Sequence, residues 1–583
     1  MAQALSGPAR PRPSPPACTM LACALRPPSR ALLRRPLAVR AVRLRGLATK
    51  RHGDPFPRGI VQPSWATLNP ETLSAANPAK LSNLCNGRWV GAQEYLDVVD
   101  PMNGEAFIQM PNTRGAEIDD FVTSAASCPK SGRHNPLKNP ERYVMYGEVF
   151  HQAGHELSRP EVMDYFAWLI ARVMPKAYYQ AWYEVKVTAD FLKNFGGDNC
   201  RFNAGGIHVS GDHAGQESKG YRWPFGPVAI VAPFNFPLEI PGLQLGGALM
   251  MGNKPTLKCA STVSAVMEQF VRMLIHCGMP AGDMDMIHCG GRAMGELLKK
   301  GPFRVTQFTG SSAVAENLAE DLRGKIRVED AGFDWKILGP DVLDVDYVAW
   351  QCDQDAYACS GQKCSAQSIA FIHDNWMRAG LVEKMARNAA ARKLEDLSIG
   401  PVLSHSTAEM LAHMNRLLEI PGAYVAFGGK ELANHTTPEQ YGMIEPTAVF
   451  VPLEEALRPE HFGAVMTEIF GPFQVLTSYD DSSLELVLEA CERVSHHLTA
   501  AVVSNDVRFR DKVLARTVNG TTYSGIRART TGAPQNHWFG PAGDPRGAGI
   551  GTPYAIQLVW SCHREIIQDH GEIPAGWTQP PPS

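Results

Sequence analysis

The stretch PVAIVAPFNFPLEIPGLQLGGALMMGNKPTLKC, residues 227–259, decides the fold of this chain. It opens with a short apolar run, continues through an apolar segment of helix length, and returns to a second short apolar run. Both short runs are bounded by Gly or Pro and are too short for a helix, which is typical of buried strands. The stretch therefore predicts a strand, a helix and a second strand, the unit from which parallel sheets are built.

The same alternation continues on the carboxyl side of this stretch. Four strands are predicted, at residues 228–232, 256–259, 284–289 and 304–308. Three helices are predicted between them, at residues 238–251, 263–277 and 293–299. Such a series is typical of a doubly wound, Rossmann-like nucleotide-binding sheet.

A second alternating region runs from residue 347 to about residue 524. It contains predicted helices at 376–394 and 407–418 and predicted strands at 368–372 and 500–503. The expected fold class is therefore α/β, with two α/β domains.

Two further segments predict contacts between subunits. In residues 161–195 the apolar residues recur with the period of a helix. Residues 203–221 are rich in Gly and alternate apolar and polar residues, which is typical of a projecting hairpin. The apolar segment 555–560 has the length of a strand. We expect the hairpin and this segment to exchange strands between subunits, so that the protein forms a homo-oligomer, a dimer or a higher assembly.

Bulk properties favour chemistry on small molecules. The chain has 583 residues, enough for at least two domains, and its 56 basic and 59 acidic residues leave a formal charge of only -3. This balance predicts no nucleic-acid or membrane partner, and no apolar run reaches the ~18 to 20 residues that cross a bilayer. The 13 cysteines include no CxxC pair, so we expect thiols and no metal site.

The amino-terminal segment has a different composition. Residues 1–53 hold ten Arg and one Lys, and no acidic residue precedes Asp54. An Arg-rich leader without acids, with interleaved Leu, is typical of a mitochondrial transit peptide, which predicts the mitochondrial matrix. A plastid address and a basic tail remain alternatives, and Met20 is an alternative start to Met1.

The most reactive candidate is the loop ACSGQKCSA, residues 358–366. Cys364 lies there between Gly, Ser and other small residues, just before a predicted strand. A thiol in such a loop is open to a substrate and close to free backbone amides, which can lower its pKa and bind an oxyanion. Taken alone, a Cys in a loop is more often structural than reactive, so Cys364 is at this point a candidate nucleophile.

Residues 361–366, GQKCSA, resemble the nucleophile motif of the aldehyde dehydrogenase superfamily. Four more motifs resemble that family in the same chain order, namely PFNFP at 233–237, GNKPTLK at 252–258, FTGSS at 308–312 and EIFGP at 468–472. The resemblance covers roughly residues 80–565. It implies the aldehyde dehydrogenase fold, with a Rossmann-like NAD-binding domain, an α/β catalytic domain and a small oligomerisation hairpin.

The resemblance also implies how the chain is divided. Residues 54–328 would form the NAD-binding domain, from which the hairpin projects, and residues 329–530 the catalytic domain. Residues 531–583 would return to the NAD-binding domain and supply a C-terminal oligomerisation strand and the tail.

The resemblance assigns roles to individual residues. Asn235 would join the Cys364 amide in an oxyanion hole, and Glu329 would be the general base. The residues implied for the cofactor are Lys258 and Ser261 at the adenosine ribose, Thr309, Gly310 and Ser311 at the pyrophosphate, and Glu468 and Phe470 at the nicotinamide ribose and ring. NAD is the expected cofactor, but Ser261 stands where NAD-selective members often have Glu, so NADP remains an alternative.

The surroundings of Glu329 point to one branch of the family. The segments EDAGFDWK, residues 329–336, and HWFGPAGDPR, residues 537–546, resemble the plant and algal Δ1-pyrroline-5-carboxylate dehydrogenases. Those enzymes oxidise glutamate γ-semialdehyde to glutamate in proline catabolism. By this resemblance Ser365, Gly549 and Gly551 would bind the substrate carboxylate.

Several alternatives stay open at this point. A carboxylate with a raised pKa suits the activation of water, but Glu329 beside Asp330 also fits an exposed, salt-bridged residue. Ser365 also fits a small packing residue. The protein as a whole could act on another semialdehyde or an aliphatic aldehyde, or could be an inactive NAD-binding protein of the same fold.

Overall fold

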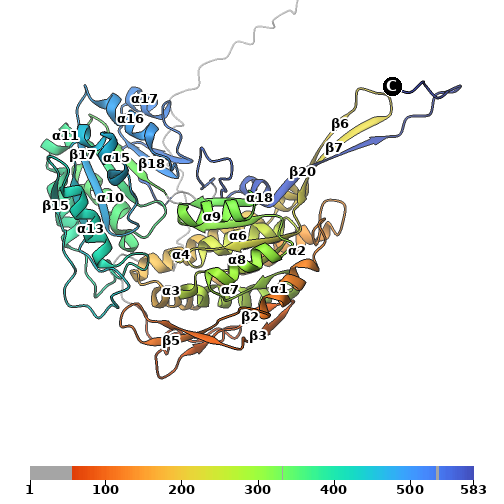
Figure 1. The fold of residues 1–583 in the computed structure, drawn as a ribbon, viewed down its shortest axis with the longest axis horizontal. Coiled ribbons are helices and arrows are strands. Elements are labelled where there is room, and N and C mark those ends of the chain that lie inside the picture. Colours follow the sequence, from red (N-terminus) through yellow and green to blue (C-terminus); the bar gives the residue numbers. More distant parts are fainter. Residues whose placement is uncertain (1–55, 331, 533–536) are drawn as a thin grey trace, which may run out of the picture. The chain divides into compact units, whose positions relative to one another are not determined.

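The computed structural model describes residues 56–330, 332–532 and 537–583 (Figure 1). By its internal contacts the chain divides into Met1–Thr49 and Lys50–Ser583, and everything described below belongs to the second unit. The predicted transit peptide, residues 1–53, lies outside the described residues.

The first large sheet has seven strands in the order β12-β11-β8-β9-β10-β2-β3. Its strands are β2 (Asn83–Cys85), β3 (Arg88–Val90), β8 (Pro227–Val231), β9 (Lys254–Lys258), β10 (Asp285–Met286), β11 (Thr306–Gly310) and β12 (Ile326–Asp330). The five strands from β12 to β10 are parallel, and β2 and β3 add antiparallel pairs at one edge. The predicted α/β class and the predicted strand series are confirmed.

Helices connect the parallel strands and cover the sheet (Figure 1). They are α6 (Glu239–Met250), α7 (Ser264–His276), α8 (Gly291–Lys300) and α9 (Ser312–Asp321). Every residue of α6 except Glu239 is buried, and apart from Glu239 and Gln244 the helix is made of apolar residues, Gly and Pro. Its amino end receives the loop that leaves β8, and this loop carries Asn235.

Three long helices pack beside the sheet upstream of the hairpin: α2 (Glu141–Leu157), α3 (Pro160–Val173) and α4 (Tyr178–Leu192). The helical period predicted over 161–195 is interrupted after Val173. Pro175 lacks a backbone N–H and restricts the residue before it, so the chain leaves the helix there and resumes it at Tyr178. The interruption places Lys176 between the two helices.

The second large sheet has the order β15-β16-β17-β14-β13-β18-β19 and is parallel except for β15. Its strands are β13 (Asp334–Leu338), β14 (Gln367–His373), β15 (Tyr424–Phe427), β16 (Thr447–Phe450), β17 (Phe473–Tyr479), β18 (Thr499–Val503) and β19 (Thr521–Ser524). Since β12 ends at Asp330 and β13 begins at Asp334, the chain passes from one sheet to the other next to Glu329. The predicted domain boundary at 328/329 falls inside β12.

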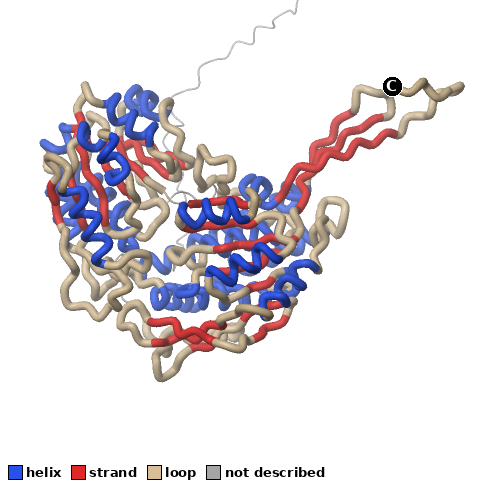
Figure 2. The backbone as a smooth tube through the Cα atoms, viewed as in Figure 1, coloured by secondary structure: helices blue, strands red, loops and turns tan. Residues whose placement is uncertain are grey.

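Helices cover the second sheet as well (Figure 2). They include α10 (Val345–Tyr357), α11 (Asp374–Arg378), α12 (Leu381–Ala390), α13 (Thr407–Leu418), α16 (Leu484–Arg493) and α17 (Val507–Leu514). The helix predicted at 376–394 is two helices, because Gly380 adopts φ +76° between them. The helix predicted at 407–418 is confirmed, and Ser406 and Glu409 form a capping box at its start.

A three-stranded antiparallel sheet projects from the rest of the described chain (Figures 1 and 2). It has the order β20-β7-β6, with β6 (Gly206–Ser210), β7 (Gln216–Pro224) and β20 (Ser561–Asp569). The strand predicted at 555–560 is wrong, because these residues belong to helix α18 (Pro553–Trp560), whose cap Thr552 accepts a bond from the Ala555 amide. Pro at the first helical position favours this helix, and the strand begins only afterwards.

Two further properties concern the described part of the chain. None of its helices is long and apolar enough to cross a membrane. Every cysteine that the structure describes is a free thiol, as the sequence predicts.

Candidate active site

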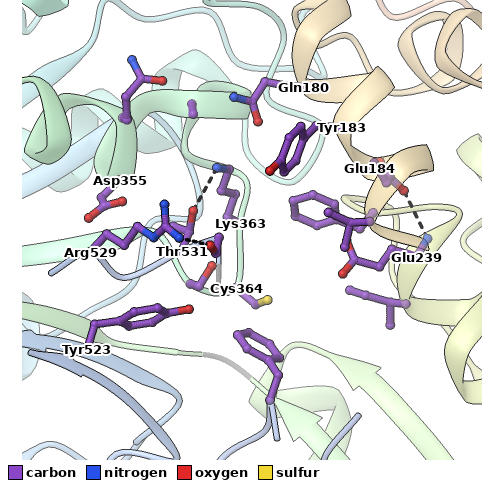
Figure 3. A pocket seen from close by; sticks show the side chains of 18 of the residues that line it. Gln180, Tyr183, Glu184, Glu239, Asp355, Lys363, Cys364, Tyr523, Arg529 and Thr531 are labelled. Carbon is purple, nitrogen blue, oxygen red and sulfur yellow. Dashed lines mark hydrogen bonds between the residues drawn. The ribbon is translucent and has the colours of Figure 1, made fainter. Parts of the chain in front are cut away.

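A cavity of about 270 Å³ contains the predicted nucleophile (Figure 3). Its walls come from α4, from the start of α6, from α10 and the loop after it, and from the segments 523–532 and 537–550. Cys364 and Ser365 both line this cavity. Segments that lie far apart in the sequence thus meet around one thiol.

The loop before Cys364 has an unusual backbone. Cys359, Ser360 and Gly361 follow one another with φ of 56°, 55° and 69°. A Cβ on Gly361 would lie 1.9 Å from the main-chain oxygen of Gly471, so only glycine fits there. This close approach fixes the nucleophile loop against the segment that carries Glu468 and Phe470.

The surroundings of Cys364 do not lower its pKa. Burial raises the pKa of the Cys364 thiol well above its usual value, and the carboxyl groups of Glu329, Asp334 and Glu468 raise it further. The predicted lowering by loop amides is therefore wrong for this state of the protein, because desolvation and like charges disfavour the thiolate. The thiol needs a proton acceptor before it can attack.

Glu329 lies next to that thiol on the edge strand β12. Its side chain interacts with Cys364, and the residue is only 4% exposed, which rules out an exposed, salt-bridged role. Burial raises the pKa of Glu329 to about 7, with a further contribution from Asp330 and an opposing one from Cys364. A carboxyl group with this pKa exchanges protons near neutral pH.

Asn235 is buried in the loop between β8 and α6, and its neighbour Phe236 lines the cavity. Lys176 Nζ donates a hydrogen bond of 2.7 Å to the Asn235 main-chain oxygen. Lys176 also forms an ion pair of 3.0 Å with Glu184, and both side chains are fully buried. Glu184 Oε1 in turn accepts bonds from the amides of Leu238, at 2.9 Å, and Glu239, at 3.3 Å. The ion pair therefore fixes the loop at both ends.

The residues predicted for the cofactor lie at the carboxyl ends of neighbouring strands. Lys258 ends β9, and Ser261 begins the short turn after it. Thr309 and Gly310 end β11, and Ser311 precedes α9. Because β8 pairs with both β9 and β11, these ends share one edge of the sheet, where doubly wound sheets bind dinucleotides.

The chemistry of this edge suits a dinucleotide. The Ser312 hydroxyl in the first turn of α9 is buried without a hydrogen-bond partner among the described residues, and the helix amino end favours an anion. No described carboxylate pairs with Lys258, which leaves its ammonium group available to a ribose. Thr309 differs, because its hydroxyl already accepts a bond of 2.9 Å from Gln244.

Glu468 and Phe470 line a small separate pocket beside the nucleophile loop. The Phe470 ring meets the Phe234 ring edge-on, with 5.9 Å between centroids, so the Glu468 segment contacts the Asn235 loop. Burial raises the pKa of Glu468 well above its usual value, as does nearby Asp334, while the Gly332 amide acts in the opposite direction.

The three residues predicted to bind a substrate carboxylate belong to two segments that both border the cavity. Ser365 lines the cavity, whereas of the 549–551 loop only Ile550 does. A Cβ on Gly549 would lie 2.3 Å from the Trp538 ring, and one on Gly551 would lie 2.4 Å from the His537 oxygen. The two glycines allow this loop to pack closely against 537–538.

Sequence reasoning missed several charged residues of the site: Lys176, Glu184, Glu239, Lys363 and Arg529. Two of these had a readable signal, because Lys176 and Glu239 are charged residues within largely apolar segments. Lys363 directly precedes the nucleophile. Nothing in the local sequence marks Arg529.

Known proteins match this chain over most of its length. A family model described as aldehyde dehydrogenase family matches residues 89–543. Delta-1-pyrroline-5-carboxylate dehydrogenase 12A1, mitochondrial, from Arabidopsis thaliana is 59% identical over 518 residues, covering 89% of this chain and 93% of the relative. A probable aldehyde dehydrogenase from Linum usitatissimum is 59% identical over 548 residues, covering 94% and 99%.

Solved structures share the fold. A betaine aldehyde dehydrogenase from Staphylococcus aureus in complex with NAD+ matches with a TM-score of 0.73 at 17% identity, covering 88% of this chain and 98% of that one. A putative aldehyde dehydrogenase from Burkholderia cenocepacia matches with a TM-score of 0.75 at 20% identity, covering 86% and 99%. At these identities the likeness concerns the fold alone.

Proposed function

The chain belongs to the aldehyde dehydrogenase family, and from this premise we propose that it oxidises L-glutamate γ-semialdehyde to L-glutamate in proline catabolism. Glutamate γ-semialdehyde is the open form of Δ1-pyrroline-5-carboxylate. The observation that carries the proposal is the Cys364 thiol beside the buried Glu329 carboxyl, in a chain 59% identical to an enzyme named for this substrate.

The first step is the activation of Cys364. Its raised pKa keeps the thiol protonated at rest, and Glu329, with a pKa of about 7, accepts the proton. The thiolate then attacks the aldehyde carbon and forms a C–S bond. The Asn235 side-chain amide and the Cys364 backbone N–H stabilise the resulting oxyanion.

Bound NAD supplies the acceptor for the hydride that leaves this carbon. Lys258 and Ser261 would hold the adenosine ribose, Thr309, Gly310 and Ser311 the pyrophosphate, and Glu468 and Phe470 the nicotinamide ribose and ring. Loss of the hydride leaves a thioester on Cys364. Glu329 passes the thiol proton to solvent and, again as a carboxylate, takes a proton from the water that attacks the thioester carbon. The C–S bond then breaks, its electron pair returns to the Cys364 sulfur, and the acid is released.

The remaining expectations follow the same premise. We propose the mitochondrial matrix as the location, supported by the name of the Arabidopsis relative and by the basic leader. We also propose a homo-oligomer assembled through the projecting β20-β7-β6 sheet.

A substrate and cofactor panel tests the proposal. NADH and NADPH formation is followed with the purified protein, using pyrroline-5-carboxylate beside succinic semialdehyde and an aliphatic aldehyde. We expect the highest kcat/KM with pyrroline-5-carboxylate and NAD. A clear preference for succinic semialdehyde would overturn the substrate assignment, and a preference for NADP would overturn the cofactor assignment.

A further inference from the structure

Glu239 is the only charged residue of helix α6, and its side chain lies at the cavity. It is the first residue of α6, four residues after Asn235, and it is the one residue of that helix that is not buried. Its side chain lines the cavity that contains Cys364. Figure 3 shows Glu239 on one side of Cys364 and Arg529 on the other.

The Glu239 carboxylate has no partner among the described residues. Only its backbone amide is engaged, by Glu184 Oε1. Burial raises the pKa of Glu239 to about 8, with a further contribution from Glu184, whereas Lys176 acts in the opposite direction. An unpaired carboxyl group at a partly dry cavity is costly to ionise, and a cation bound in the cavity would remove that cost.

The opposite side of the cavity carries two cations, beside Asp355, whose carboxylate is paired with Lys336 at 2.8 Å. Lys363 is 7% exposed and donates to Thr531 Oγ1 at 3.4 Å, and Arg529 donates to the Gly532 oxygen. No carboxylate of the described residues forms an ion pair with either cation. The cavity therefore separates a carboxyl group from two unpaired cations, with the nucleophile between them.

This separation of charge suits a particular class of aldehyde. A zwitterionic amino acid can place its ammonium group on the carboxyl side and its carboxylate on the cationic side. A dicarboxylic semialdehyde of the same length has no group for Glu239, and an aliphatic aldehyde has none for either side.

We propose that Glu239 binds the α-ammonium group of the substrate and makes the enzyme prefer an α-amino-acid aldehyde over the same aldehyde acid without the amine. This rests on the proposed function, since it concerns the same cavity and the same reaction.

The test compares two aldehydes that differ only in the amine, L-glutamate γ-semialdehyde and glutaric semialdehyde. In the full chain, Glu239→Gln keeps the size of the side chain and removes its charge. We expect the ratio of kcat/KM values between the two aldehydes to fall by about tenfold or more, the loss typical of one charge-assisted hydrogen bond. The rate with glutaric semialdehyde should stay unchanged. Cyclisation of the amino aldehyde affects all variants equally and cancels in the comparison.

Two further variants act as controls. Glu239→Asp keeps the charge and should retain part of the preference. Glu454→Gln changes an exposed glutamate on α14 (Leu453–Ala456), outside the cavity, and should leave the ratio unchanged.

A binding measurement gives a second readout that does not depend on turnover. Calorimetry with the Cys364→Ala protein should show tighter binding of L-glutamate than of glutarate, and adding Glu239→Gln should abolish the difference.

An unchanged ratio in Glu239→Gln, or an equal loss with both aldehydes, would overturn the assignment of Glu239. Failure of the proposed function would differ from this, because the unsubstituted enzyme would then not oxidise glutamate γ-semialdehyde at all.

Discussion

Lys176 Nζ donates a 2.7 Å hydrogen bond to the main-chain oxygen of Asn235, although 59 residues separate them in the sequence. The ammonium group also lies 4.5 Å from the centre of the Phe236 ring and is neutralised by Glu184. Glu184 also accepts hydrogen bonds from the backbone amides of Leu238 and Glu239 at the start of α6. One buried ion pair therefore fixes the loop between β8 and α6. The residue assigned to the oxyanion hole therefore depends on a distant pair of charges for its position.

Removing one of these charges should destabilise the protein more than removing both. Lys176→Met leaves Glu184 buried without a counter-ion, which costs about 3–5 kcal/mol of unfolding free energy. The double variant Lys176→Met/Glu184→Gln should recover most of this loss but still lower kcat, because the Asn235 loop is no longer fixed. Denaturant unfolding and kcat measure the two effects. If the double variant is as unstable as the single one, the pair does not act as described.

Activity should follow the ionisation of Glu329. Its pKa of about 7 means that the carboxylate, the form that accepts protons, predominates above that pH and is lost below it. Thioester hydrolysis should therefore slow by about tenfold per pH unit below pH 7. The dependence of steady-state kcat on pH, measured from pH 5.5 to 8.5, shows whether activity falls in this way. Glu329→Gln removes both the acceptor of the Cys364 proton and the base for water, so it should lose the NADH burst and steady turnover together. Steady turnover by that variant would contradict the role.

The two cysteines of the nucleophile loop should behave differently. Cys364→Ala removes the atom that bonds to the substrate and should lower kcat by at least about 10³-fold. Cys359→Ala is the matched control, because Cys359 is buried and its thiol lies 3.6 Å from Gln180 Oε1. It should retain most of the activity. Comparable losses in both variants would indicate damage to the loop rather than loss of a nucleophile.

Gly361 should tolerate no side chain. In Gly361→Ala the Cβ would meet the Gly471 oxygen at a positive φ, so we expect a loss of about 2–5 kcal/mol and a lower kcat. Gly380→Ala has a similar φ of 76°, but its Cβ would meet nothing closer than 3.6 Å. It should cost only about 1–2 kcal/mol and leave kcat unchanged. Equal effects in denaturant unfolding would show that the contact with Gly471 is unimportant.

The projecting sheet should control assembly. Val209 on β6 and Ile567 on β20 both lie opposite Ser218 on β7, so they share one face, and they are 56% and 69% exposed. Exposed apolar residues on one face of a sheet, here on either side of Ser218, mark a contact surface. Val209→Glu/Ile567→Glu should give smaller species in sedimentation velocity, with Glu454→Gln as the unchanged control. An assembly of undiminished size would rule out this face.

The local sequence was sufficient to predict helices and strands whose start or burial depends on residues within the same segment. The strand β8 is a short apolar run that follows a Gly and precedes a Pro, and such a run has few alternatives to a buried strand. The strands β9 (KPTLK) and β11 (TQFTG) were predicted from their short length and their place in the alternation of strands and helices. The start of α13 was readable because Ser406 and Glu409 satisfy its first amides locally. The apolar run 555–560 was misread because six apolar residues fit a strand or a helix equally well, and Thr552-Pro553 before it favours the helix.

The sequence by itself determined which groups are available, namely the thiol of Cys364, the carboxyl group of Glu329 and the loops that carry them. Only the tertiary structure decided their chemical state. The pKa of Cys364 is raised by burial and by carboxyl groups from three other segments, and Glu239 owes its raised pKa to burial beside Glu184. Desolvation and charge interactions depend on which groups are close in space, and separation along the sequence does not predict that closeness.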